Sequence, residues 1–216
     1  MKRAGNSGET SRGGKRQKVM VEERRLSFEL WMEGVQKEAK VTVTHSEKKV
    51  KSWIKKAVRA IDKRGNNYSV GINVHFSSRT RALATIELGV STHSLIFQVS
   101  QSEIPDCLRE FLENESYYFV TSRKKRKIMR ALKDDNGIDF DCEDVSKYIW
   151  KPTSVRKRAA YDTWKDLAAK KLQMDAAQFT TIDDWKWDAE ELPEDQVIAA
   201  SFDVILATRI GSKFRF

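Results

Sequence analysis

The chain has 216 residues, of which 40% are hydrophobic and 33% are charged, and its formal net charge is +9. A chain of this length can bury one sizeable core, so we expect a single folded domain. No apolar run is long enough to span a bilayer and no charged-then-apolar signal segment occurs, so we expect a soluble protein that is not secreted. Cys107 and Cys142 form no CxxC pair and lie near no histidine at ligand spacing, which predicts two buried free thiols.

The first 25 residues are predicted to be a basic tail outside the domain. Residues 1–18 carry six Lys or Arg and one Glu, a net charge of +5, and have no apolar periodicity. Such a segment buries too little apolar surface to offset the entropy of ordering, so we expect residues 1–25 to be disordered. Its basic clusters at 2–3 and 15–18 have the spacing of a bipartite nuclear-import signal, although such clusters also occur by chance. We therefore expect a nuclear or nucleo-cytoplasmic protein.

Alternating apolar residues predict that the domain begins with a β-hairpin. Apolar side chains alternate along 26–32 and again along 41–43, and Gly34 lies between these stretches. A helix is predicted next, because Ser46 is a suitable N-cap and Gly65 is placed to end the helix. Its apolar stripe consists of Val50, Trp53, Ile54, Ala57 and Ile61.

The middle of the chain is predicted to contribute most of the sheet. Three short strands are expected over 68–76, 82–90 and 93–99, and the polar turns between them are typical of an antiparallel meander. Pro105 is then placed to begin a helix, and 117–121 has the pattern of a brief strand.

The second half of the chain is predicted to be mostly helical. We expect helices over 124–132, along the apolar stripe of 164–172, and from Pro193 to Ile210, with Gly211 ending the last one. A meander followed by alternating strands and helices is typical of an α/β fold, in which helices flank a mixed sheet.

Four segments resemble the Werner-type branch of the DnaQ-like 3′-to-5′ exonucleases, the DEDDy family. The clearest is 181–213, TIDDWKWDAEELPEDQVIAASFDVILATRIGSK, which is similar to the family's closing segment. Next is 82–99, ALATIELGVSTHSLIFQV, which is similar to its paired strands. Residues 68–76, YSVGINVHF, and 119–132, FVTSRKKRKIMRAL, occupy the places of the first two motifs. The resemblance implies that 26–216 form a ribonuclease-H-like exonuclease domain, with a mixed sheet of five to six strands flanked by helices.

The resemblance also identifies the positions where the family holds catalytic metal. In the family, carboxylates from separate segments bind two Mg²⁺ or Mn²⁺ ions, which activate water and stabilise the leaving oxygen. The corresponding residues here are Asn73 and His75 in the first motif, Lys127 in the second, and Ala199 and Asp203 in the third. Asp203 is therefore the only retained ligand position, and no catalytic set is intact. We expect no cofactor, and Mg²⁺ or Mn²⁺ only if activity is retained.

Formal charge at these positions argues against the family's hydrolysis. The charges of Lys127 and Asp203 cancel, Asn73 and His75 are neutral, and two divalent cations need several anionic oxygens. We expect Lys127 to contact Asp203, directly or through one water, with Asn73 and His75 lining the same hollow, or alternatively to extend into solvent. An active site could survive if the motifs align differently, or if neighbouring acids replaced the missing ligands. The candidates are Glu87, Asp139, Asp141, Glu143 and Asp144.

Three further features each have a binding and a structural interpretation. A basic run places six cations in eight residues, as in a phosphate-binding patch or a solvated helix face. The predicted nucleic-acid-binding residues are Arg123, Lys124, Lys125, Arg126, Lys127 and Arg130. His75 with Asp203 offers only two ligands to a softer metal, so a hydrogen-bonded histidine is favoured. Trp185 and Trp187 are expected to pack near the final helix rather than to stack on bases.

These observations favour a nucleic-acid-binding protein with an exonuclease-like fold and no hydrolytic activity. Two other hypotheses stay open: an active, metal-dependent 3′-to-5′ exonuclease with a rearranged site, and a non-catalytic assembly or regulatory subunit. DNA or RNA is the expected partner, no membrane contact is expected, and self-association is left open. The matched segments contain no Ser/His/Asp or Cys/His set and no Gly-rich phosphate loop, so the enzyme classes that use them lack support.

Overall fold

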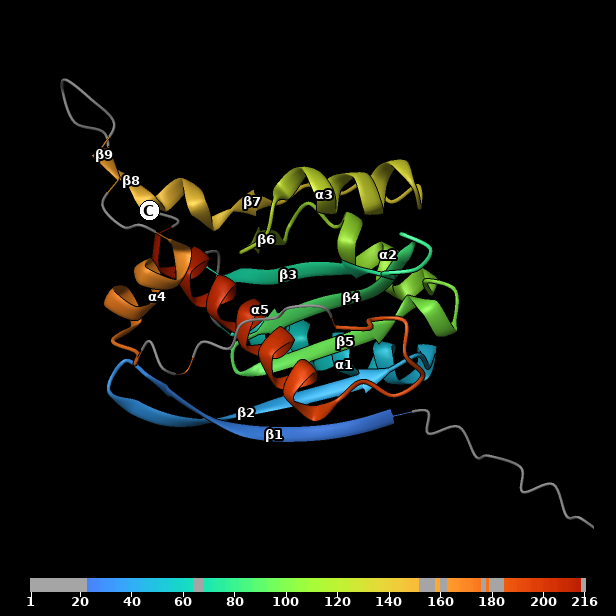
Figure 1. The fold of residues 1–216 in the computed structure, drawn as a ribbon, viewed down its shortest axis with the longest axis horizontal. Coiled ribbons are helices and arrows are strands. Elements are labelled where there is room, and N and C mark those ends of the chain that lie inside the picture. Colours follow the sequence, from blue (N-terminus) through green and yellow to red (C-terminus); the bar gives the residue numbers. More distant parts are fainter. Residues whose placement is uncertain are drawn as a thin grey trace, which may run out of the picture.

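A seven-stranded mixed sheet forms the centre of the protein (Figure 1), and its strand order is β1-β2-β5-β4-β3-β6-β7. The computed structural model describes residues 23–63, 68–151, 158–159, 163–175, 178 and 185–214. The strands of the sheet are β1 (Glu23–Met32), β2 (Val35–Thr44), β3 (Ser69–Phe76), β4 (Leu83–Val90), β5 (His93–Gln98), β6 (Tyr118–Thr121) and β7 (Glu143–Asp144). The predicted α/β class is confirmed. The sheet has one strand more than predicted, because the two residues of β7 are too few to show a periodic pattern.

The sheet combines antiparallel and parallel pairs. Strands β3, β4 and β5 form the predicted antiparallel meander, while β2 pairs in parallel with β5, and β6 with β3. The β1–β2 hairpin turns at Glu33 and Gly34, which both have positive φ, as a two-residue hairpin turn of type I′ requires. Strand β1 begins at Glu23, three residues before the predicted domain boundary, and residues 1–22 lie outside the described residues.

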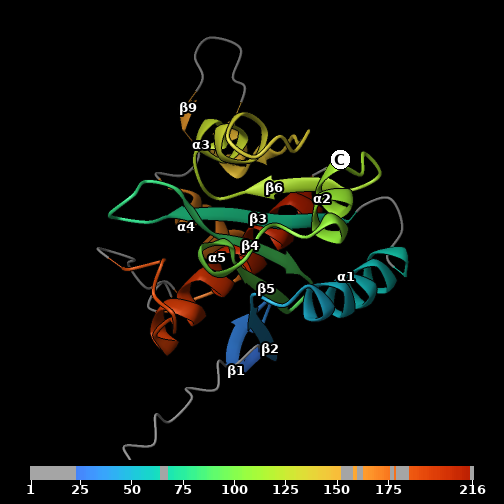
Figure 2. The same ribbon diagram turned by 90° about the vertical axis from the view of Figure 1, so that its right-hand side faces the viewer.

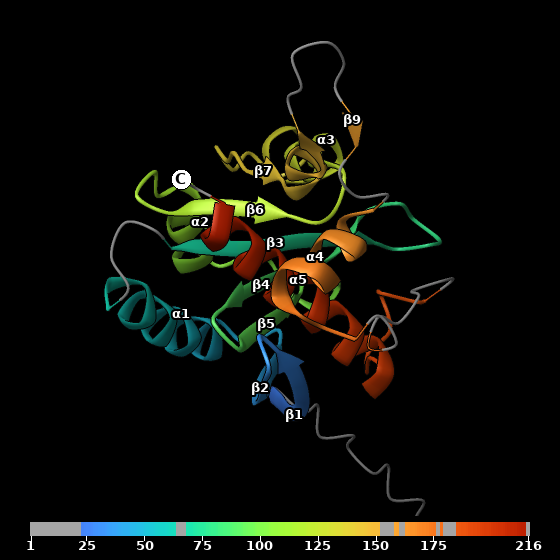
Figure 3. The same ribbon diagram turned by 90° about the vertical axis from the view of Figure 1, so that its left-hand side faces the viewer.

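Helices cover both faces of the sheet. Figures 2 and 3 place α1 (Glu47–Asp62) and α2 (Asp106–Glu113) on one face, and α4 (Trp164–Leu172) and α5 (Glu194–Phe214) on the other. The helix α3 (Lys125–Met129) continues as the π-helical turn η3 (Arg130–Asp134). The remaining elements are the 3₁₀ turns η2 (Val99–Gln101) and η4 (Val145–Ile149), and the strand pair β8 (Trp150–Lys151) and β9 (Arg158–Ala159). Gly65, predicted to end the first helix, lies outside the described residues.

Two paired glycines allow α5 to lie directly on the sheet. Gly71 on β3 and Gly89 on β4 face each other in the strand register. A Cβ atom on Gly71 would lie 1.9 Å from the carbonyl oxygen of Val204, and one on Gly89 would lie 2.7 Å from that oxygen. The N–H of Gly71 donates a 2.8 Å hydrogen bond to Oγ1 of Thr208. These contacts fix the position of α5, and therefore that of Asp203 beside Val204.

The last helix extends beyond the predicted end at Gly211. Helix α5 continues to Phe214, with Gly211 buried inside it. A Cβ atom on Gly211 would lie 2.7 Å from Cγ1 of Val120 and 2.8 Å from Oγ of Ser69. The glycine therefore permits close packing of the helix on the sheet and does not end the helix. A single sequence cannot distinguish these two uses of glycine.

Neither cysteine forms a disulfide bond. Cys107 and Cys142 are free thiols, as predicted, but only Cys142 is buried, whereas Cys107 is partly exposed. Burial raises the pKa of Cys142 to about 12, so its thiol stays protonated at neutral pH and packs as a small apolar group. Among the helices that the structure describes, none is both long enough and apolar enough to cross a membrane.

Candidate functional site

Strand β3 places Asn73 in the interior, where both ends of its amide form hydrogen bonds. Asn73 is wholly buried. Its Oδ1 accepts a 2.7 Å hydrogen bond from Oγ1 of Thr121, and its Nδ2 donates a 3.2 Å hydrogen bond to Oγ of Ser122. These partners lie at and just after the end of β6, which pairs with β3. The side chain that aligns with the family's first acid therefore links two parallel strands.

His75 lies two residues further along β3, on the same face of the strand as Asn73. Its ring stacks on that of Trp187, with 3.5 Å between the ring centroids and 17° between the planes. Trp187 is buried, which confirms packing as its role. The Nε2 atom of His75 lies 3.2 Å from Oε1 of Glu87. The imidazole therefore lies between an aromatic ring and a carboxylate, but its Nε2 makes no hydrogen bond to any described residue, in contrast to the expected hydrogen-bonded histidine.

Glu87 is a buried carboxylate beside Asn73 and His75. It lies on β4, directly opposite Asn73 in the strand register, and is wholly buried. Its Oε1 accepts a 3.3 Å hydrogen bond from Thr85, whereas its Oε2 is buried with no hydrogen-bond partner among the described residues. The other acids suggested as substitutes interact elsewhere: Asp139 with Lys133, Asp141 with Lys125, Glu143 with Tyr118 and Lys147, and Asp144 with the N–H of Ser146. Glu87 is the one that lies beside an aligned position.

Helix α5 brings Asp203 to the same location and pairs it with an arginine. The Oδ2 atom of Asp203 lies 3.1 Å from Nη2 of Arg123. Burial raises the pKa of Asp203 from its ordinary value of 3.8 to about 6, against the attraction of Arg123, Lys165 and His75, and Glu87 raises it further. At neutral pH the carboxylate is therefore mainly ionised, and a guanidinium balances its charge.

The expected direct contact between Lys127 and Asp203 is wrong, because Arg123 is the cation that pairs with Asp203. Helix α3 begins only at Lys125, and Lys127 is exposed on it. Arg123 lies just after β6, where its backbone N–H donates a 2.9 Å hydrogen bond to Oγ1 of Thr121. Ala199, in the place of the family's tyrosine, is buried one turn before Asp203. It contributes a methyl group and cannot orient water.

The residues at the aligned positions do not fit a pair of hard divalent cations. Mg²⁺ and Mn²⁺ require several free oxygen ligands, and the protein usually provides them as carboxylates. Here Asp203 holds Arg123, Asn73 bonds to two hydroxyls, and Glu87 lies against His75. Within the described ranges, no group of three or more His, Cys, Asp or Glu side chains is arranged to hold a metal ion.

The structure divides the predicted basic run into paired and unpaired cations. Arg123 pairs with Asp203, and Lys125 pairs with Asp141. The other four are exposed, and no ion pair joins them to any described residue; they are Lys124, Arg126, Lys127 and Arg130. The run is thus partly a set of structural ion pairs and partly an exposed positive surface, which we call the α3 basic surface.

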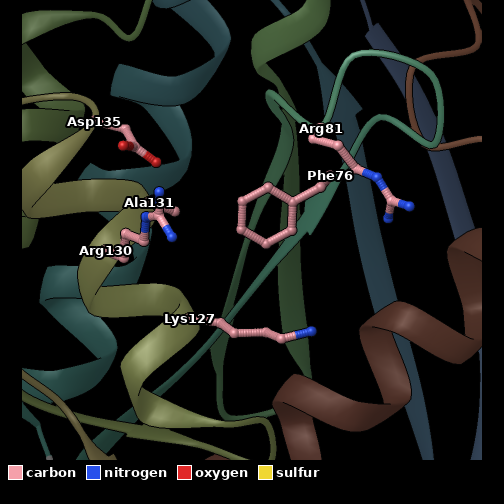
Figure 4. Close-up of a pocket in the computed structure, with 6 residues that line it drawn as sticks. All are labelled: Phe76, Arg81, Lys127, Arg130, Ala131 and Asp135. Atoms are coloured by element: carbon pink, nitrogen blue, oxygen red, sulfur yellow. The ribbon is translucent and has the colours of Figure 1, made fainter.

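Part of the α3 basic surface borders a hollow of about 310 Å³. The hollow lies between the α3–η3 helix and the turn that joins β3 to β4, and its lining consists of Phe76, Arg81, Lys127, Arg130, Ala131 and Asp135. Figure 4 shows the ring of Phe76 between Arg81 on one side and Arg130 with Asp135 on the other. The side chain of Lys127 extends below the ring. An aromatic ring and three cations therefore share one concave surface.

Sequence reasoning missed three residues of these two sites. Arg123 was predicted to bind nucleic acid, and nothing in the sequence showed that it pairs with Asp203. Phe76 was visible only as the end of a strand, and the sequence does not show that the strand register shifts between His75 and Phe76. Arg81 has a φ of 62° in the β3–β4 turn, a conformation that its residue type does not indicate.

Comparison with known proteins identifies the fold. No protein-family model and no curated protein matches the sequence. Among solved structures, RNase D from Escherichia coli, an exoribonuclease involved in structured RNA processing, superposes with a TM-score of 0.57 at 16% identity, covering 79% of this chain and 43% of that one. The catalytic core of RRP6 from Trypanosoma brucei gives a TM-score of 0.55 at 13% identity, with 80% and 46% covered. NrnC from Brucella melitensis, bound to pGG, gives 0.50 at 16% identity, with 67% and 72% covered.

These similarities concern the arrangement of the backbone. The chain spans less than half the length of the first two solved structures. The three superpositions cover 79%, 80% and 67% of this chain. The protein therefore has the fold of the DnaQ-like 3′-to-5′ exonucleases.

Proposed function

We propose that this protein binds nucleic acid on an exonuclease-like fold and does not hydrolyse it by the two-metal route. The placement of the cations in 123–130 carries the proposal. Arg123 pairs with the carboxylate that a metal would need, while four other cations lie on the surface without an ion pair to any described residue. We expect no cofactor for this function.

The absence of hydrolysis follows from the chemistry of the donor groups. A water molecule becomes a nucleophile at neutral pH when a metal ion lowers its pKa, and a guanidinium has no such effect because it stays protonated and only donates hydrogen bonds. Arg123 beside Asp203 can bind an anionic oxygen but cannot activate water. The alanine at position 199 also lacks the hydroxyl that orients water in the family.

Nucleic-acid binding is supported by the α3 basic surface. Exposed Lys and Arg side chains gain binding free energy from phosphate groups by releasing condensed counterions. Lys124, Arg126, Lys127 and Arg130 have no acidic partner among the described residues that would have to be displaced first. The fold belongs to proteins that include an exoribonuclease and a protein bound to a dinucleotide, pGG.

An active exonuclease with a rearranged site is the second candidate, and Glu87 favours it. Glu87 and Asp203 are two buried carboxylates. The Oε2 atom of Glu87 has no hydrogen-bond partner among the described residues, so it is available to bind a metal ion. Activity by this route would require Arg123 to leave Asp203 when substrate and Mg²⁺ or Mn²⁺ bind. A non-catalytic assembly subunit is the third candidate, and it predicts no nucleic-acid binding.

We also propose that the basic tail directs the protein to the nucleus. Its two basic clusters are the only support for this proposal, and they lie outside the described residues. A fluorescent fusion of the full chain should be nuclear. The same fusion with the cluster at 15–18 changed to alanine should be distributed through the cell, and an unchanged distribution would contradict the proposal.

Binding is tested by titrating the protein into labelled single-stranded DNA and RNA while fluorescence anisotropy is followed. We expect binding that tolerates changes in sequence, because phosphate contacts carry no base information. Lys124→Gln with Arg126→Gln should weaken it. The matched control is Lys55→Gln with Lys56→Gln, which removes the same charge from the exposed face of α1. Equal losses for the two pairs would contradict a binding surface at α3.

A further inference from the structure

We infer that the hollow beside α3 is a subsite for one nucleotide of a bound strand, with the base stacked on Phe76 and phosphates held by Arg81, Lys127 and Arg130. This inference rests on the proposed nucleic-acid binding. It goes beyond that proposal because it assigns one nucleotide of the strand to the hollow. It also adds Phe76 and Arg81 to the interface.

The cations of the hollow are available for an anionic ligand. No ion pair or side-chain hydrogen bond joins Arg81, Lys127 or Arg130 to another residue in the described part of the chain, whereas Arg123 and Lys125 beside them are paired. The only acid in the lining is Asp135, so the formal charge of the lining is three cations less one carboxylate, or +2. Like charges around a concave surface repel one another, and an anion relieves that repulsion.

Phe76 supplies a surface for a base. Its side chain is partly buried and packs against the main hydrophobic core on one side, which fixes the ring, while it lines the hollow on the other. Bases stack on such rings regardless of their identity, because every base has a π face. A fixed aromatic ring with cations around it is therefore suited to a nucleotide rather than to phosphate alone.

The size and position of the hollow separate it from the aligned metal positions. At about 310 Å³ it lies at the small end of the range of roughly 300–1,000 Å³ for ligand pockets, which suits one nucleotide rather than several. The strand register shifts between His75 and Phe76, and Phe76 packs against the core cluster that contains Ile72 and Val74, the residues that alternate with Asn73 and His75 along β3. Binding in the hollow therefore requires neither a metal ion nor the carboxylate of Asp203.

Two probes test the subsite: a labelled oligothymidylate, and an abasic sugar-phosphate chain of equal length and label. Phe76→Leu keeps an apolar side chain and removes the ring, so it should weaken oligothymidylate binding by about fivefold or more and leave binding of the abasic chain unchanged. Arg130→Gln and Arg81→Gln should weaken binding of both probes. Arg59→Gln is the matched control, because Arg59 is an exposed cation on α1 that belongs neither to the α3 basic surface nor to the lining of the hollow.

The outcomes distinguish failure of the subsite from failure of the proposed function. If the protein binds both probes but Phe76→Leu weakens both equally, or Arg130→Gln and Arg81→Gln lose no more affinity than Arg59→Gln, the hollow is not a nucleotide subsite and general binding stands. If the unaltered protein binds neither probe at ~0.05 M salt, both proposals fail. Thermal denaturation checks that each variant is folded. If Phe76→Leu does not fold, Arg81→Gln still tests whether the hollow binds the strand.

Discussion

Arg123 gives the aligned positions a different chemistry from that of a metal site. A bound metal ion can be removed by a chelator, and its carboxylate ligands then repel one another. The guanidinium of Arg123 is covalently part of the chain and is always protonated, so the charge of the Arg123–Asp203 pair changes only when Asp203 titrates. Glu87 and His75 are the other titratable groups that face this carboxyl. The consequences should therefore appear in the pH dependence of stability rather than in its dependence on metal.

Replacing Arg123 should destabilise the fold in a pH-dependent way. Arg123→Gln leaves the buried Asp203 carboxylate without its cation, which should lower the free energy of unfolding by about 1–3 kcal/mol at pH 8. At pH 4 the loss should nearly disappear, because the raised pKa of Asp203 means that the folded protein already holds this carboxyl protonated. Urea denaturation at pH 8 and at pH 4 measures the free energy of unfolding of the variant and of the unaltered protein. Arg126→Gln is the control, and equal losses at both pH values would contradict the ion pair.

Asp203 itself should make the protein less stable as the pH rises. A folded-state pKa above the ordinary value means that the folded protein binds the proton more tightly, so this stability is complete below about pH 3.8 and is lost as the pH rises through about 6. The difference between these pKa values corresponds to about 3 kcal/mol at most. Asp203→Asn should match the unaltered protein near pH 3.5 and exceed its stability by up to that amount at pH 7. A less stable Asn variant at pH 7 would contradict the burial argument.

Among the elements, those with a clear period could be predicted from the sequence. Alternation identified the hairpin and the meander, and helical spacing identified α1, α4 and α5. The failures involve contacts between segments distant in the chain. Gly211 had the signal of a helix end because its neighbours on β3 and β6 are not visible in the sequence. Lys127 was placed beside Asp203 by an ungapped match, which cannot show that α3 begins at Lys125 and turns Lys127 outward.

The contact between α5 and the glycine pair should tolerate no side chain. Gly71→Ala would place Cβ 1.9 Å from a backbone oxygen, which α5 can relieve only by moving away from the sheet. We expect a loss of more than about 3 kcal/mol, or failure to fold. Gly137→Ala is the comparison, since its Cβ would meet nothing within 4 Å and only its positive φ opposes the change, at about 1–2 kcal/mol. Denaturation curves that give the two variants equal stability would contradict the close packing of α5 on the two glycines.

For the whole molecule, nucleic-acid binding should depend strongly on salt. If the four unpaired cations of the α3 basic surface each contact a phosphate of a single strand, affinity should fall on the order of 50-fold between ~0.05 M and ~0.2 M salt. Lys124→Gln with Arg126→Gln should reduce the slope of log affinity against log salt by about half. Anisotropy titrations at several salt concentrations measure the slope. An affinity that does not change with salt would contradict phosphate binding by these side chains.

The most direct test of the account is whether the purified full chain binds a nucleic-acid strand and leaves it intact. The protein is incubated with 5′-labelled single strands and 3′-recessed duplexes, of DNA and of RNA, in Mg²⁺ or Mn²⁺. Binding and strand length are then measured in the same samples. We predict that strands are bound and keep their full length, because Arg123 holds the carboxylate of Asp203 and the aligned positions offer too few free oxygens to metal. A ladder of 3′-shortened products that disappears in Asp203→Ala would contradict this account and establish the protein as an exonuclease.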